Sequence, residues 1–70
     1  MSRGGTCSFE HSRVMVVTPN GGLRIYVGGD VGRPEWFAQE HIHDDSEIYR
    51  AGQEGTLVVP EWVALRKGLI

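Results

Sequence analysis

The sequence predicts a mainly β fold: a small SH3-like or OB-like barrel, or a curved antiparallel sheet, with a short C-terminal helix. Short β-branched runs recur along the chain between glycine-rich turns, and only the C-terminus carries a clear helical pattern. The chain has 70 residues, which is enough for one hydrophobic core and too few for two. Hydrophobic residues make up 40% of it, which is typical of a folded domain.

The domain organisation predicted is a flexible N-terminal arm over residues 1–11, followed by a single small β-rich domain over residues 12–70. The first eight residues are small and polar, and two of them are the adjacent glycines Gly4 and Gly5. Such a segment buries too little apolar surface to offset the entropy lost on ordering.

A β-hairpin is the clearest local pattern. Residues 13–18 are mostly β-branched and apolar, and residues 19–22 contain an Asn-Gly pair suited to a tight turn. Residues 23–27 then alternate strictly between apolar and polar or aromatic side chains, the period of a half-buried strand. The alternation predicts that Arg24 and Tyr26 leave the core on the same side.

The middle of the chain predicts short elements joined by loops. Residues 28–34 form a glycine-rich loop, and residues 35–37 a short strand. Residues 38–41 are long enough for one helical turn only. The polar segment 43–47 is expected on the surface, and residues 56–59 form another apolar strand.

A short amphipathic helix is predicted over residues 60–67. Pro60 suits the first helical position, basic residues occupy the last turn, and Gly68 is placed to end the helix. Trp62 and Leu65 are three residues apart, so they are expected to lie on one side and to anchor the helix against the sheet.

The histidine pair His41 and His43 is the first candidate for chemistry. Two histidines that are two residues apart in an extended segment point the same way, so they could ligate a metal or act as general acid and base. No second ligand pair has metal-finger spacing, and neither Ser46 nor Cys7 lies in a nucleophile motif. We therefore expect a protein that is not an enzyme and that uses no metal or other cofactor.

Binding is the better-supported expectation. Trp36 and Phe37 are adjacent, so in a strand they point to opposite faces and one of them lies outside the core. Guanidinium groups bind phosphate, and an indole offers a stacking surface. We predict one ligand-binding face made of Arg24, Arg33, Trp36, His41 and His43. A nucleotide or phosphorylated metabolite suits this set, and the same groups suit the rim of a protein interface.

Charge and cysteine content restrict the partners and the compartment. The formal net charge is −2, the opposite of the basic balance typical of proteins that bind nucleic acid through phosphates, so nucleic acid is a disfavoured partner. The single cysteine, Cys7, cannot form an intramolecular disulfide, which fits a reducing cytoplasm. No signal peptide or membrane span is expected. A chain this small is expected to gain stability by forming a homo-oligomer.

A longer pattern covers about the second half of the chain. It runs from Trp36 to Ile48 (WFAQEHIHDDSEI), continues as GTLVVPEWVA over residues 55–64, and ends with KGL over residues 67–69. This succession resembles small uncharacterised proteins of tailed phages and prophages. Their pattern has a Pro-Lys-Ser-like turn where this chain has residues 38–40, so the lysine of that turn has no counterpart here. The resemblance implies a phage origin and a host-cell location, and it implies no activity.

These observations lead to three functional hypotheses. The first is a phage-type accessory binding module that is not catalytic, such as an anti-defence protein that binds a host protein or sequesters a nucleotide signal in the host cytoplasm. The alternative is a small barrel that binds single-stranded nucleic acid through Trp36, Arg24 and Arg33. The third is a metal-dependent hydrolase built on His41 and His43.

Overall fold

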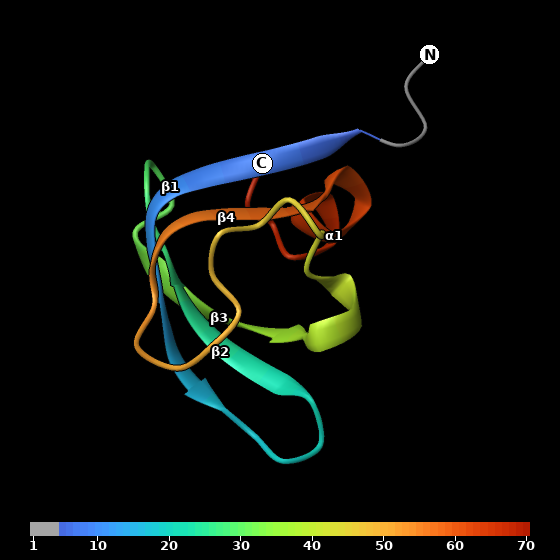
Figure 1. Cartoon of the computed structure of the whole chain (residues 1–70). Helices are drawn as coiled ribbons and strands as arrows, with labels where there is room; N and C mark the ends of the chain where they lie inside the picture. Colours follow the sequence, from blue (N-terminus) through green and yellow to red (C-terminus); the bar gives the residue numbers. More distant parts are fainter. Residues whose placement is uncertain (1–4) are drawn as a thin grey trace.

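The computed structural model describes residues 5–70, and within them four antiparallel strands form one curved sheet (Figure 1). The strand order is β3-β2-β1-β4, and the sheet is not closed into a complete barrel. No helix in this part of the chain is long and apolar enough to cross a membrane. The mainly β class with a short C-terminal helix is therefore confirmed. The elements are β1 (Thr6–Val17), β2 (Gly22–Val27), β3 (Arg33–Ala38), the 3₁₀ turn η1 (Gln39–His41), β4 (Glu54–Pro60) and α1 (Glu61–Arg66).

The predicted hairpin is present as β1 and β2, but β1 begins at Thr6, seven residues before the hairpin pattern of residues 13–18. Its first half pairs with β4, where Cys7 lies opposite Val59 and Phe9 opposite Leu57. The prediction of a flexible arm is therefore wrong for residues 6–11, and residues 1–4 lie outside the described part. The strand partner that orders this segment lies about 50 positions later in the chain, so local composition carries no sign of it.

Strand β1 pairs with both β2 and β4, and it is bent at two irregularities in its register (Figure 1). The register with β4 shifts between Phe9 and Ser12, where His11 has a positive φ of 61°. The register with β2 shifts between Val14 and Val16. Extra residues of this kind bend a strand and increase its twist, which explains how one strand curls around the core.

The core lies on the concave side of the sheet and is continuous across all four strands and α1. Phe37 of β3 lies directly across from Leu23 of β2, and both are almost fully buried. Ser12 is also buried: its hydroxyl donates to the Phe9 carbonyl oxygen (2.8 Å) and accepts from the Gly28 amide (2.9 Å). The hydrophobic members are Phe9, Val14, Leu23, Ile25, Val27, Phe37, Ile48, Leu57, Val59, Val63, Ala64 and Leu69.

The segment between η1 and β4 closes the free edge of β4. The His43 amide donates to the Val58 carbonyl oxygen (2.9 Å), and the Glu47 amide donates to that of Thr56 (2.9 Å). Ser46 and Ile48 are buried. The prediction that residues 43–47 form a surface segment is therefore wrong for Ser46, because this segment acts as a cover for an edge that would otherwise be unpaired.

Helix α1 is present, but its buried side differs from the predicted one. Pro60 is the N-cap in extended conformation, and the helix begins at Glu61. Val63 and Ala64 are buried, whereas Trp62 is 50% exposed and Leu65 59% exposed. The prediction that Trp62 and Leu65 anchor the helix is wrong. A helix of six residues has too few turns for spacing to define a face, so the exit direction of β4 decides which side meets the core.

We expect Trp62→Ala to lower the free energy of unfolding by only about 1–2 kcal/mol, well below the 3–5 kcal/mol typical of a buried aromatic. The reason is that half of the Trp62 side chain stays in contact with water in the folded state. Urea denaturation of the variant and the parent measures the difference. A loss as large as that of a core aromatic would contradict the observed exposure.

Candidate ligand-binding face

The convex side of the sheet carries exposed aromatic, basic and apolar side chains. Residues that are direct cross-strand partners share a face, and Trp36 of β3 pairs with Arg24 of β2, which pairs in turn with Val16 of β1. In the next row, Tyr26 lies between Pro34 and Arg13. We call this surface the outer face and define it by Arg13, Met15, Val16, Arg24, Tyr26, Pro34 and Trp36.

Trp36 and Arg24 form one half of the outer face. The Arg24 guanidinium lies 5.5 Å from the centroid of the Trp36 ring, within the range of a cation–π contact. Trp36 also lies beside Gly22, where a Cβ would approach its ring to 3.8 Å, and it remains 45% exposed. Within residues 5–70, the Arg24 side chain has no hydrogen bond or ion pair, so its donors are available to a ligand.

A hollow of about 640 Å³ occupies the other half of the outer face. Arg13 and Tyr26 border it, and the Arg13 guanidinium lies 3.9 Å from a Glu54 carboxylate oxygen. Both partners of this ion pair are largely exposed, so it costs little to open. The lining residues are His11, Ser12, Arg13, Met15, Tyr26, Glu54 and Gly55.

The hollow lies where β1 bends. His11 lies in the bulge between the Phe9 and Ser12 register pairs, and its positive φ is unusual for a residue other than glycine. Ser12, the neighbouring lining residue, points into the core and holds the Gly28 amide. The hollow therefore lies at a bend whose flanking residues are paired with the neighbouring strands.

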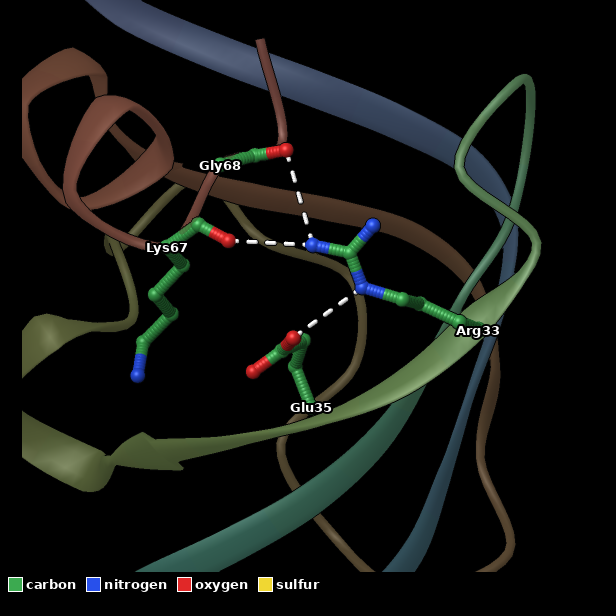
Figure 2. A network of polar contacts seen from close by, with 4 residues as sticks. All are labelled: Arg33, Glu35, Lys67 and Gly68. Carbon is green, nitrogen blue, oxygen red and sulfur yellow. Dashed lines mark hydrogen bonds and ion pairs between the residues drawn. The ribbon is translucent and has the colours of Figure 1, made fainter.

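Arg33 lies on the opposite side of the sheet from Trp36 and Arg24, because it pairs with the buried Val27. Its Nη2 donates to the carbonyl oxygens of Lys67 (3.0 Å) and Gly68 (3.5 Å), and its Nε lies 3.1 Å from a Glu35 carboxylate oxygen (Figure 2). Carbonyl groups at the end of a helix lack intrahelical partners. Arg33 therefore ties β3 to the end of α1.

The two histidines lie near η1 and contact different groups. The His41 ring meets the Trp62 ring edge to face, with centroids 4.9 Å apart, and its Nε2 lies 3.8 Å from a Glu40 carboxylate oxygen. The Nδ1 of His43 accepts a hydrogen bond from the Asp45 amide (3.0 Å). No group of three or more His, Cys, Asp or Glu side chains within residues 5–70 is arranged to hold a metal ion.

The five predicted binding residues therefore do not share one face. Only Arg24 and Trp36 lie together, whereas Arg33 is engaged by α1 and the histidines lie in and after η1. Residues 39–41 form a 3₁₀ turn rather than extended chain, so the two-residue spacing does not align the histidines as predicted.

Sequence reasoning missed the hollow and the residues that border it. The strand alternation already places Tyr26 on the same side as Arg24, so that signal was available. No local signal places Arg13 beside Tyr26, because that pairing depends on the bulges in β1.

Comparisons of the chain with known protein families, with curated proteins and with solved structures found no match.

Proposed function

We propose that this protein is a binding module, without catalysis, whose outer face holds a nucleotide-class ligand: a planar ring joined to phosphate. The observation that carries the proposal is the hollow on the outer face, which has an exposed aromatic ring and a guanidinium group at its border. Its volume of about 640 Å³ lies within the roughly 300–1,000 Å³ of small-molecule sites.

Each lining group suits one part of such a ligand. The Tyr26 ring, 40% exposed, offers a stacking surface for a base, and Met15 adds apolar contact beside it. The Arg13 guanidinium can grip a phosphate through two parallel hydrogen bonds. Glu54 can accept a hydrogen bond from a ring amino group or a sugar hydroxyl. A nucleotide would use all four.

The hydrogen bonds of the Ser12 hydroxyl support binding of the ligand without chemical conversion. The Ser12 hydroxyl uses its proton on the Phe9 carbonyl oxygen and accepts from the Gly28 amide, so it is engaged in the core. Sequestering a nucleotide signal, one form of the accessory role expected from the sequence, needs binding only. The other form, binding of a host protein, would use the same aromatic and basic groups but needs no hollow.

The test is an NMR titration of the ¹⁵N-labelled protein with a panel of mononucleotides, which detects binding even at millimolar Kd. We expect shifts of Arg13, Met15 and Tyr26 amides, and a roughly 5- to 150-fold weaker Kd for Tyr26→Ala, as for loss of one base stack. Arg13→Ala should weaken binding about tenfold or more, because it removes a charged hydrogen-bond donor.

Two matched controls separate the site from general effects. Tyr49→Ala removes another exposed tyrosine, and Arg66→Ala removes another exposed arginine, both outside the outer face. Both should bind like the parent. If no mononucleotide shifts the outer-face amides, or if the controls weaken binding as much as the site variants, the hollow is not a nucleotide site.

A further inference from the structure

We infer that the outer face binds single-stranded nucleic acid, with two consecutive bases stacked on Tyr26 and Trp36. The inference rests on the proposed function and extends it. The hollow accounts for Tyr26 but not for the exposed Trp36 or for Arg24, which contacts the Trp36 ring and has no ion-pair partner within residues 5–70. These two residues form a second pair of an aromatic ring and a guanidinium group on the outer face.

The sheet sets the two aromatic rings at neighbouring diagonal positions. Tyr26 pairs across the sheet with Pro34, and Trp36 pairs with Arg24, so the two rings stand on adjacent strands one row apart. Diagonal neighbours on one face of a sheet are about 7–8 Å apart. Single-stranded bases that are unstacked from each other and stacked on aromatic side chains can occupy such a pair of positions.

Arginines alternate with the aromatic rings in the same two rows. Arg24 is the direct cross-strand partner of Trp36 and stands two residues from Tyr26 on the same side of β2, so it adjoins both rings. Arg13 is the cross-strand partner of Tyr26. A phosphate that links the two bases would meet Arg24, and the next phosphate would meet Arg13. Because Arg24 has no acceptor within residues 5–70, no ion pair must be broken for this contact.

The charge of the chain limits the kind of nucleic acid. The formal net charge is −2, so long-range attraction to a polyanion is absent and binding depends on the few contacts of the outer face. A duplex hides its base faces in the stack and cannot use Tyr26 or Trp36. The expected ligand is therefore a short single-stranded segment, with two phosphate contacts and modest, salt-dependent affinity.

The first test compares ligand length. Titrations with thymidine monophosphate, the dinucleotide and a thymidine hexanucleotide should show a clear gain in affinity from one to two nucleotides. Trp36→Ala should remove that gain, weakening dinucleotide binding roughly 5- to 150-fold while leaving mononucleotide binding unchanged. Trp62→Ala is the matched control, because Trp62 is exposed to a similar degree and lies on α1. It should bind all three ligands like the parent.

The second test counts phosphates through salt dependence. With two phosphate contacts on a single strand, log K for the hexanucleotide should fall with log[salt] with a slope of about −1.4, and Arg24→Ala should reduce the slope to about −0.7. Arg33→Ala is not a suitable control, because Arg33 holds the end of α1. The control is Arg66→Ala, since Arg66 is exposed and lies outside the outer face. Arg66→Ala should leave the slope unchanged.

The outcomes separate this inference from the proposed function. The inference is overturned if mononucleotides bind at the hollow and affinity does not rise from one to two nucleotides, or if that rise in affinity survives Trp36→Ala. Either result leaves the nucleotide site intact. An absence of binding at any length overturns both. A hexanucleotide duplex that binds as well as the single strand also overturns the inference.

Discussion

Replacing Gly28 by alanine is expected to destabilise the protein by at least about 3 kcal/mol, the upper end of what overpacking usually costs. Gly28 is buried where the chain leaves β2 and meets the bend of β1. A Cβ at this position would overlap the carbonyl oxygens of Glu10 and His11 and would lie 2.5 Å from the carbonyl carbon of His11. These are backbone atoms, so no side-chain rotation can relieve the clash.

The surrounding structure cannot move away without further loss. The Gly28 amide donates to the Ser12 hydroxyl, which in turn donates to the Phe9 carbonyl oxygen, so a shift of Gly28 leaves buried polar groups unpaired. Against a total stability of roughly 5–15 kcal/mol for a natural domain, such a loss leaves a large share of the chain unfolded.

Thermal and urea denaturation measure this effect, and Gly29→Ala is its matched control. Gly29 has a positive φ of 63°, and a Cβ there meets nothing within 4 Å. Its replacement therefore costs only the strain of the left-handed conformation, about 1 kcal/mol. Equal losses for the two variants would show that the close approach of Gly28 to β1 does not contribute to stability.

Phe37→Ala should cost about 3–5 kcal/mol, whereas Trp36→Ala, at the adjacent position, should cost about 1–2 kcal/mol. The Phe37 side chain is 2% exposed and lies across from Leu23, and the Lys67 ammonium lies 5.2 Å from its ring centroid. Its removal leaves a cavity in the core. Trp36 points to the outer face, where almost half of it remains in water.

The same pair of variants should show the opposite order in binding. Trp36→Ala should fold and lose affinity for an oligonucleotide. Phe37→Ala should lose stability, but the Phe37 side chain makes no direct contact with the ligand. Urea denaturation combined with the dinucleotide titration tests both statements. If Trp36→Ala destabilises the protein as much as Phe37→Ala, the loss of binding in that variant says nothing about a stacking role.

The secondary structure could be read from local patterns to a large extent. The alternation over residues 23–27 separates core from surface correctly in β2, and the adjacent aromatics do face opposite sides, with Phe37 in the core and Trp36 outside it. Both results follow from the two-residue period of a strand, which depends on no distant part of the chain.

The prediction failed where the decisive partner is remote in sequence. Residues 6–11 are ordered by β4, and Ser46 is buried because its segment covers the edge of that strand. Arg33 was predicted to bind a ligand, but it is held by carbonyl groups 34 and 35 residues further along the chain.

For the candidate site, the sequence by itself determined that Arg24 and Tyr26 leave the core and that Trp36 and Phe37 take opposite faces; the structure shows that Trp36 is the outer of the two. Only the tertiary structure decided that Arg13 joins them, that a hollow opens beside Tyr26, and that Arg33, His41 and His43 lie elsewhere. The orientation of a side chain in a strand follows from its own backbone period, whereas the neighbours of that side chain depend on register. Here the register is shifted by two irregularities in β1, one against each flanking strand.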